Sequence, residues 1–420
     1  MRNIETLCMD AKQASRPLAG AGPEQKNRFL DSLANWLANH QDHIIAENTL
    51  DVQDGKKVGL SEALVDRLTL TAERISGMAD DLRHLVALPD PVGEVFEQSI
   101  TEQGLKVRKQ RVPLGVLAVI YESRPNVTVD VAALAIKSGN AIILRGGKET
   151  IRSNQVLVSG IHSALAVSGL PSAAVQFISE PDRSHVEKLL KMHDYIDMLI
   201  PRGGAALHRY CRENSSIPVI TGGIGICHLF VDQSADLAQS LQVIRNAKIQ
   251  RPTVCNALDT VLVHRAIAAD LIPRLIAALG ADGVAFRLDG RAMDIAEGME
   301  TPAVSPAGPE DFDTEWLSLV LGIKVVDGID EAIEHICLHS THHSDGILTQ
   351  DKDNAEIFTA LVDSAAVYVN ASTRFTDGSQ LGLGAEVAIS TQRLHARGPM
   401  ALRELTTYKW VIEGDYTARA

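Results

Sequence analysis

The chain has 420 residues, of which 45% are apolar and 22% charged, and its formal net charge is -13. This balance is ordinary for a globular protein, and the length predicts two or three domains. The acidic charge argues against a nucleic-acid partner. No apolar run approaches the roughly 18 residues of a membrane span, so we expect a cytoplasmic protein without a membrane partner.

Helical periodicity dominates residues 1–88, where Phe29, Leu33 and Leu37 share one face of a predicted helix. From 92 to 112, apolar and polar residues alternate on both sides of a Glu-Gln-Gly turn. This alternation predicts a long, exposed hairpin.

Continuous apolar strands then alternate with amphipathic helices, beginning with "LGVLAVIYE" and "AIILRGGKE". This pattern is typical of a parallel sheet covered on both faces. A second series starts near residue 233 and includes "DTVLVH", "GIKVV" and "AAVYVN". The sequence therefore predicts an α/β protein with two doubly wound parallel-sheet domains. Residues 289–315, rich in Pro, Gly and acidic residues, are expected to form a surface connection.

Three glycine-rich turns follow predicted strands: "LRGGKE", "IPRGGAA" and "TGGIGIC". Glycines at such turns let a dinucleotide pyrophosphate approach backbone N–H groups, although none of the turns matches G-x-G-x-x-G. An ordinary turn and a nucleotide site therefore both remain open. The candidate cofactor contacts are Arg145, Gly146, Gly147, Lys148, Gly203, Gly204, Gly222 and Gly223. The two cations suit a phosphate on the adenosine ribose.

Five scattered cysteines form no C-x-x-C pair, which argues against a disulfide framework and a thiolate zinc site: Cys8, Cys211, Cys227, Cys255 and Cys337. Cys255 lies in the polar loop "QRPTVCNALDT". A free cysteine is usually a small buried hydrophobe, whereas a nucleophile must be a thiolate. Lys248, Arg251 or a helix beginning at "CNALD" would favour the thiolate. Spacing alone leaves both interpretations open.

Four histidines gather in "EHICLHSTHHSD": His335, His339, His342 and His343. The first two have the i, i+4 spacing that can bind zinc on a helix. H-E-x-x-H is absent, and histidines on a solvated helix face are common, so we expect no metal.

Three arginines of the C-terminal third, Arg374, Arg393 and Arg397, lie in glycine-rich segments. They belong either to surface loops or to an anion site, because the guanidinium fork matches phosphate and carboxylate oxygens.

The segments "QRPTVCNALDT", "YESRPNVT", "AIEHICLHSTHHSDGI" and "VNASTRFTDGSQLGLGAEVAISTQRLHARGPMALRELTTYKW" resemble those of gamma-glutamyl phosphate reductases, over essentially the whole chain. This family, also called glutamate-5-semialdehyde dehydrogenase, belongs to the aldehyde dehydrogenase superfamily. The resemblance implies an NADP(H)-binding domain at 1–91 and 113–232 and a catalytic domain at 233–392. It also implies a small oligomerisation element at 92–112 and 393–420, and hence a homo-oligomer.

The resemblance also implies the reaction. NADPH would reduce L-glutamyl 5-phosphate to L-glutamate 5-semialdehyde and phosphate, the second step of proline biosynthesis, through a thioester on Cys255. Asn126 resembles the superfamily asparagine that forms an oxyanion hole with the backbone N–H of the nucleophile. Glu315 resembles the glutamate that contacts the nicotinamide ribose. Arg374 and Arg397 would hold the anionic ends of the substrate.

Two alternatives stay open beside the reductase. One is a hydrolytic aldehyde dehydrogenase that oxidises free aldehydes. Such relatives activate water with a glutamate in E-L-G-G-K, where this chain has Ile220 and Thr221. The other is a non-catalytic nucleotide- or metal-binding protein, which the intact Cys255 loop disfavours. Association with the glutamate 5-kinase that supplies the substrate is a further hypothesis.

Overall fold

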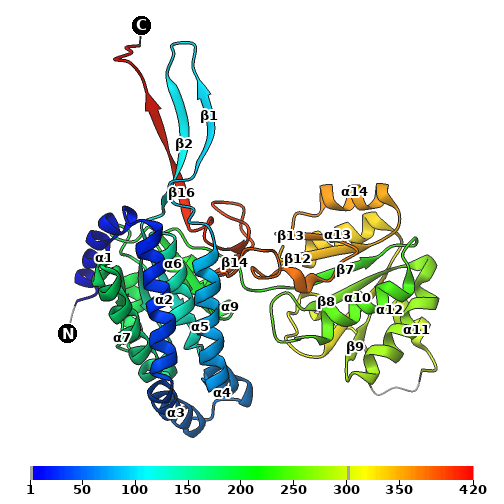
Figure 1. Ribbon diagram of the computed structural model, residues 1–420. Coiled ribbons are helices and arrows are strands. Elements are labelled where there is room, and N and C mark those ends of the chain that lie inside the picture. The colour runs from blue at the N-terminus through cyan, green and yellow to red at the C-terminus, as the bar shows by residue number, and fades with distance from the viewer. Residues whose placement is uncertain (1–2, 300–302, 420) are drawn as a thin grey trace. The chain divides into compact units, whose positions relative to one another are not determined.

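The computed structural model describes residues 3–299 and 303–419, shown in Figure 1. The chain divides into two compact units, which are described separately. Unit 1 comprises Met1–Thr221, Gly382–Ala388 and Met400–Ala420, and unit 2 comprises Gly222–Leu381 and Ile389–Pro399. Within the described ranges, no helix combines the length and apolar character that crossing a bilayer requires.

Unit 1 opens with five helices, as the periodicity predicted. They are α1 (Ile4–Ala19), α2 (Pro23–Asn39), α3 (Gln41–Lys57), α4 (Glu62–Leu68) and α5 (Ala72–Ala87). Local chemistry sets several of their starts, because the side chains of Asn3, Ser61 and Thr71 accept N-terminal N–H groups of α1, α4 and α5.

The sheet of unit 1 contains β3 (Val116–Tyr121), β4 (Ala141–Arg145), β5 (Val175–Phe177) and β6 (Met198–Arg202). Its order is β5-β4-β3-β6, and every pairing is parallel. The intervening helices are α6 (Asn126–Lys137), η1 (Lys148–Thr150), α7 (Ile151–Ser168), η2 (Ser172–Ala174), α8 (Arg183–Leu189) and α9 (Ala205–Asn214). The strand order reverses beside β3, the position where α/β sheets bind ligands at the carboxyl ends of their strands.

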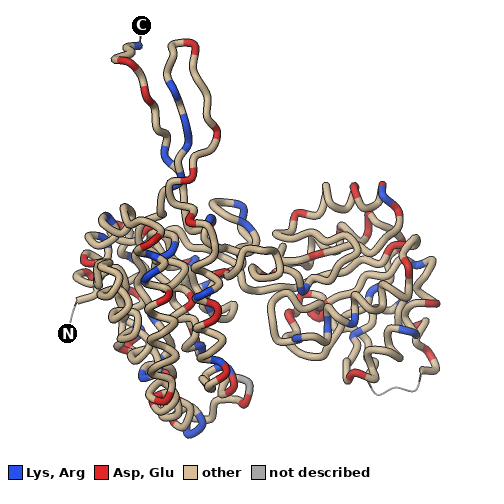
Figure 2. The backbone as a smooth tube through the Cα atoms, viewed as in Figure 1, with Lys and Arg blue, Asp and Glu red and all other residues tan. Residues whose placement is uncertain are grey.

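A separate antiparallel sheet of unit 1 contains β1 (Val95–Ile100), β2 (Lys106–Pro113) and β16 (Thr406–Glu413). The predicted hairpin is thus confirmed, and Figure 1 shows it extending away from the helices of this unit. Figure 2 shows basic residues along β2. They pair with carboxylates of this unit, for example Arg108 with Glu413 at 2.7 Å and Arg111 with Glu94 at 2.9 Å.

Unit 2 contains a seven-stranded parallel sheet in the order β10-β9-β11-β8-β7-β12-β13. The strands are β7 (Cys227–Val231), β8 (Leu258–His264), β9 (Ala285–Leu288), β10 (Val304–Pro306), β11 (Val320–Val326), β12 (Ser344–Leu348) and β13 (Ala366–Val369). The helices are α10 (Leu237–Ile249), α11 (Arg265–Ala281), α12 (Gly290–Ala296), η3 (Asp311–Asp313), α13 (Ile329–His339), α14 (Lys352–Leu361) and η4 (Thr373–Phe375). Two short strands, β14 (Ala388–Ser390) and β15 (Gly398–Met400), lie in the C-terminal segment. The predicted α/β fold with two parallel-sheet domains is confirmed.

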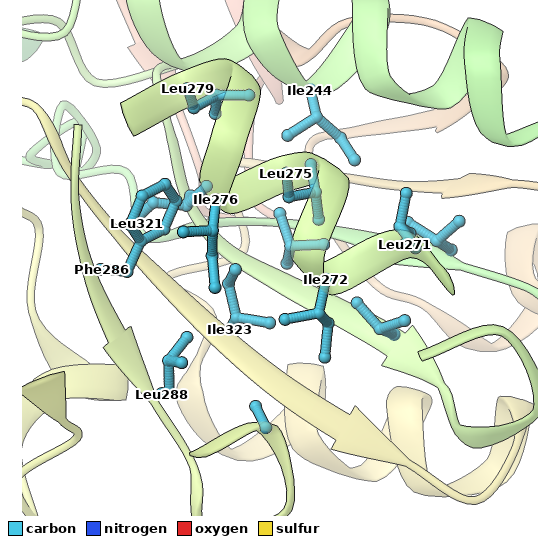
Figure 3. Packing of buried hydrophobic residues seen from close by; sticks show 14 of the residues in the cluster. Ile244, Leu271, Ile272, Leu275, Ile276, Leu279, Phe286, Leu288, Leu321 and Ile323 are labelled. Carbon is cyan, nitrogen blue, oxygen red and sulfur yellow. The ribbon is translucent and has the colours of Figure 1, made fainter. Parts of the chain in front are cut away.

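The main core of unit 2 lies between α11 and the sheet. Figure 3 shows Ile272 and Ile276 of this helix packed over Phe286 of β9 and Ile323 of β11. Removing such side chains from water supplies most of the stabilisation of a fold. This core holds β8 rigidly, and β8 begins three residues after Cys255.

The prediction of a simple surface connection at 289–315 is wrong. α12 lies in this segment, and its Ala292 and Ala296 belong to the core. β10 extends the sheet as its edge strand, paired with β9. Pro306 is tolerated there because an edge strand leaves one row of N–H groups unpaired. Residues 300–302 lie outside the described residues.

Candidate active site

Cys255 lies in the loop between α10 and β8, and its side chain is half-buried. The loop turns directly into β8, so the helix considered at "CNALD" does not form. The Cys227 thiol donates a hydrogen bond to the Cys255 carbonyl at 3.3 Å. Gly225 packs on the same carbonyl so closely that a Cβ there would come within 1.5 Å of its oxygen. The backbone of the nucleophile candidate is therefore held from one side by residues 225–227.

Asn256 fixes the other side of this loop. Its side-chain amide donates to the carbonyls of Thr376, at 3.0 Å, and Arg374, at 3.3 Å. In return, the Thr373 hydroxyl donates to the Asn256 carbonyl at 2.7 Å. These bonds bind η4 to the residue after Cys255, which brings Arg374 of the C-terminal third into the same site.

Arg374 lies close enough to both Cys255 and Arg251 to feel their charges. Its Nε donates to the Gln250 side-chain oxygen at 3.2 Å, a neutral partner. Burial and then the Arg251 charge lower the pKa of Arg374, while Cys255 acts in the opposite direction. Arg251 is exposed and makes no hydrogen bond or ion pair with any residue in 3–299 or 303–419. The Cys255 loop therefore carries positive charge, which the nearby Asp377 carboxylate opposes without a hydrogen bond to either arginine among the described residues.

Lys248, the other cation considered for the thiol, is buried in unit 2. Its ammonium donates to the Leu258 carbonyl at 2.8 Å and lies 3.7 Å from Asp259 Oδ1. Burial lowers the pKa of Lys248. Its hydrogen bond and ion pair thus support the start of β8.

Two acidic side chains contact segments next to the Cys255 loop. Asp259 accepts the Trp316 N–H at 3.1 Å, and burial, opposed by the Lys248 charge, raises its pKa to about 6. Glu315 accepts the Gly225 N–H at 2.9 Å, and mainly burial raises its pKa to about 7. Glu315 thus contacts the segment that packs on Cys255.

Arg397 is placed differently from Arg374. Its guanidinium donates to the Asp363 carboxylate and carbonyl, and Arg393 binds the same carboxylate. These two arginines lower the pKa of Asp363 to about 2. Arg397 therefore has an anionic protein partner, which Arg374 lacks among its hydrogen bonds.

Asn126, in unit 1, is the first residue of α6. Its amide nitrogen donates to Asp130 Oδ2 at 2.9 Å, one helical turn further on. Burial, with Asp81 adding to it, raises the pKa of Asp130 to about 7. Asp130 was not among the candidates, although the i, i+4 spacing is visible in the sequence.

The glycine turns follow strands as predicted, and several have no room for a side chain. A Cβ on Gly146 would lie 2.2 Å from Asn154 Nδ2, and one on Gly147 would lie 2.1 Å from Glu149 Oε1. Gly203 and Gly204 precede α9, and Gly204 donates to Glu122 Oε2 at 3.2 Å. The third pair, Gly222 and Gly223, belongs to unit 2.

Arg145, at the end of β4, and Lys148, in the turn that follows, differ in whether their charged groups are free to bind a ligand. Arg145 is buried, and its guanidinium donates to the carbonyls of Gly146, at 2.7 Å, and Pro181, at 3.0 Å. Lys148 is exposed and makes no hydrogen bond or ion pair with any residue that the structure describes.

The histidine segment forms α13 and β12, but the expected solvated face is wrong for His335. This residue is buried beside His228, and burial lowers its pKa to about 2. His228 pairs with Asp345 at 3.0 Å, and His339 with Asp313 at 2.8 Å. Across the two described ranges, no three His, Cys, Asp or Glu side chains are grouped so as to hold a metal ion.

Several known proteins are similar to this chain in sequence and in fold. The model of the aldehyde dehydrogenase family matches residues 2–285. A gamma-glutamyl phosphate reductase of Roseiflexus castenholzii is 56% identical over 424 residues, covering 100% of both chains. The crystal structure of a gamma-glutamyl phosphate reductase from Thermotoga maritima has a TM-score of 0.97 at 45% identity, again covering 100% of both. An engineered glycolyl-CoA reductase with bound NADP+ shares the fold, with a TM-score of 0.69 at 15% identity, over 98% of this chain and 97% of that one.

Proposed function

Because the chain belongs to the aldehyde dehydrogenase family, among its gamma-glutamyl phosphate reductases, we propose that Cys255 is the nucleophile that attacks the substrate carbonyl. The enzyme is an oxidoreductase that uses a nicotinamide cofactor and reduces L-glutamyl 5-phosphate to L-glutamate 5-semialdehyde in proline biosynthesis. The single observation that carries the role of Cys255 is the rigid seating of its carbonyl between Gly225 and the Cys227 thiol.

In the proposed mechanism, the Cys255 thiolate forms a C–S bond with the acyl carbon, and the C–O bond to phosphate breaks. Phosphate leaves with the electron pair and takes up a proton from solvent. The cofactor, when bound, supplies a hydride to the thioester carbonyl. The C–S bond then breaks, which frees the aldehyde and regenerates the thiolate for the next turnover.

We propose that Asn126 and the Cys255 backbone N–H stabilise the oxyanion that forms at each addition step. An amide group carries two N–H donors, and Asp130 accepts one from Asn126. The second N–H donor of Asn126 remains for the oxyanion. Removing one donor from an oxyanion hole typically lowers kcat by about 10²- to 10³-fold.

For the phosphate of the substrate we propose Arg374, with Arg397 at the other anionic end. The like charge of Arg251 near Arg374 supports this role, because two adjacent guanidinium groups favour binding of a dianion between them. Because Arg397 forms a salt bridge with Asp363, it would bind substrate only through the N–H groups that Asp363 does not accept.

We assign cofactor binding to unit 1 and acyl transfer to unit 2. In unit 1 the cofactor would contact the backbones of Gly146, Gly147, Gly203 and Gly204. The family resemblance adds Gly222 and Gly223 of unit 2, and Glu315 of unit 2 at the nicotinamide ribose. Lys148, which has no hydrogen-bond or ion-pair partner among the described residues, fits an anionic cofactor. We propose NADPH as the preferred cofactor, since Lys148 can meet a 2′-phosphate.

A homo-oligomer is proposed through the sheet of β1, β2 and β16. Three apolar side chains of this sheet are largely exposed: Ile100 at 72%, Trp410 at 55% and Ile412 at 59%. A group of exposed apolar side chains is typical of an interaction surface, whereas single exposed ones are common on monomers. We also propose a cytoplasmic location and association with a glutamate 5-kinase, because the labile acyl phosphate favours direct transfer.

The experiment that tests the mechanism runs the reaction in reverse. Ile220 and Thr221 stand where hydrolytic relatives have a base, so water should not cleave the thioester efficiently. Oxidation of glutamate 5-semialdehyde by NADP+ should therefore stall in phosphate-free buffer and resume when phosphate or arsenate is added. Rapid multiple turnover without either anion would instead support the hydrolytic enzyme.

A further inference from the structure

The topology of unit 1 indicates where the adenosine end of a dinucleotide lies. In a doubly wound sheet, the residues that read the 2′ position of the adenosine ribose follow the second strand. Strand β4 pairs with β3, the first strand, on the side opposite β6. The turn after β4, and the loop after its neighbour β5, therefore border this position.

Arg145 joins these two segments. It ends β4, is only 9% exposed, and donates to Gly146 within its own turn and to Pro181 in the loop between β5 and α8. Because both terminal nitrogens are bound to carbonyls, Arg145 acts as a tie between the two segments, with its guanidinium already engaged.

Arg183 lies two residues beyond Pro181, at the first position of α8, and is exposed. Its charge contributes to the lowered pKa of Arg145, after burial, so the two guanidinium groups are close enough to repel. Within the parts of the chain that the structure describes, Arg183 has no hydrogen-bond or ion-pair partner, like Lys148. The neighbouring carboxylate of Asp182 accepts the Ser184 N–H at 2.9 Å.

Glu149, the acid next to Lys148, faces another group. Glu149 could read a 2′-hydroxyl and repel a 2′-phosphate, but its Oε1 accepts both the N–H and the hydroxyl of Ser123, at 2.8 and 2.7 Å. Gly147 leaves the space that this orientation of Glu149 requires. Lys148 and Arg183 therefore lie at this edge of the sheet without partners among the described residues. Glu149 is hydrogen-bonded to Ser123.

We propose that Arg183 binds the 2′-phosphate of NADP(H) together with Lys148, and that Arg145 is a positioning residue that holds the Arg183 loop in place. This inference rests on the proposed cofactor site of unit 1. It adds a specificity-determining residue that the glycine motifs did not indicate.

Equilibrium binding to the full-length protein tests the proposal without turnover. The probes are 2′,5′-ADP and ADP, followed by NADP+ and NAD+, in isothermal titration calorimetry. Arg183→Ala should weaken 2′,5′-ADP and NADP+ about ten-fold or more, as expected for a lost charge-assisted hydrogen bond, and change ADP and NAD+ by less than about two-fold. Arg183→Gln should behave like Arg183→Ala. The control is Arg28→Ala, an exposed arginine of α2 that should leave all four affinities unchanged.

The outcomes distinguish the role of Arg183 from the preference of the enzyme for NADPH. Unchanged 2′,5′-ADP affinity in both Arg183 variants, or equal losses for ADP and 2′,5′-ADP, would overturn the role of Arg183. A wild-type protein that binds ADP as tightly as 2′,5′-ADP would instead show that the proposed NADPH preference is wrong. Selective loss in the Arg183 variants, with wild-type thermal unfolding, would establish the proposal.

Discussion

The side-chain amide of Asn126 is held by Asp130, whose Oδ2 accepts it at 2.9 Å. Burial raises the pKa of this carboxyl to about 7, and the Asp81 charge adds to the shift. A carboxyl whose folded pKa exceeds its ordinary value stabilises the fold at low pH. That stability is lost as the pH rises from the ordinary value of about 4 through about 7, because the ionised form must stay buried.

Asp130→Asn should therefore make the protein more stable but slower. At pH 8 the variant avoids a half-buried carboxylate, so its Tm should exceed that of the wild type by about 2 °C or more. The difference should shrink toward pH 5, where Asp130 is neutral. A neutral carbonyl holds the Asn126 amide less firmly, so kcat should fall about three- to ten-fold. Thermal unfolding and initial rates from pH 5 to 8 provide both measurements.

The matched control for this pair is Asp80→Asn, which removes an exposed carboxylate paired with Arg83 on α5. It should leave kcat and the pH dependence of Tm unchanged. An Asp130→Asn variant with a lower Tm than wild type at pH 8 would show that its ionised carboxylate is stabilised by contacts that outweigh burial.

Gly225→Ala should displace the proposed nucleophile Cys255 while leaving its thiol in the sequence. The added Cβ would lie 1.5 Å from the Cys255 carbonyl oxygen, a backbone atom that cannot rotate away. We expect a loss of about 100-fold or more in kcat/KM, because small misplacements of reacting groups cost this much. Gly290→Ala, where nothing lies within 4 Å, should have normal activity. A near-normal rate for Gly225→Ala would mean that the loop can move without consequence.

Cys255→Ala should abolish turnover and leave thermal unfolding nearly unchanged, since covalent catalysis has no substitute nucleophile. Cys337→Ala, which removes an exposed thiol on α13, is the control. Cys8, Cys211 and Cys227 are buried, and their replacement should cost far less activity than that of Cys255. Mass spectrometry after brief alkylation should find Cys255 protected by substrate; persistent turnover in Cys255→Ala would refute the thioester mechanism.

Arg374→Lys retains the charge of Arg374 but loses its planar fork, so the KM for phosphate in the reverse reaction should rise about ten-fold while the KM for cofactor stays constant.

Arg397→Lys should raise the KM for glutamate 5-semialdehyde. Because Arg397 binds Asp363, the comparison variant is Asp363→Asn. If Asp363→Asn reproduces the effect of Arg397→Lys, Arg397 acts through its salt bridge and not through the substrate.

The elements of regular structure were predictable because their patterns are local. Apolar runs such as 116–121 give buried strands, and the alternation in 92–112 gives a hairpin. Two short elements, α12 and the three-residue β10, were missed because a few residues carry too little periodicity to distinguish them from a loop.

Side-chain partners were harder to predict, because they come from distant parts of the chain. Arg145 ends a strand and suggests a phosphate ligand, but its guanidinium binds a carbonyl 36 residues further on. Histidines on a solvated helix face are common, whereas His335 is buried beside His228 of β7 and Phe312. Asp130, in contrast, is four residues from Asn126 on the same helix and could have been identified by its spacing.

The pairing of β2 with β16 also has a consequence for synthesis on the ribosome. The guanidinium of Arg111 donates to the Thr406 hydroxyl across this sheet at 3.3 Å, and the two residues are 295 positions apart in the chain. At about 5 to 20 residues per second, β2 emerges about 15 to 60 seconds before its partner. During this interval its hydrogen-bonding edge is open to other nascent chains on the same messenger. During this interval Arg108 also lacks its partner Glu413 of β16, so its charge repels an identical strand, which gives this residue a role before the fold is complete.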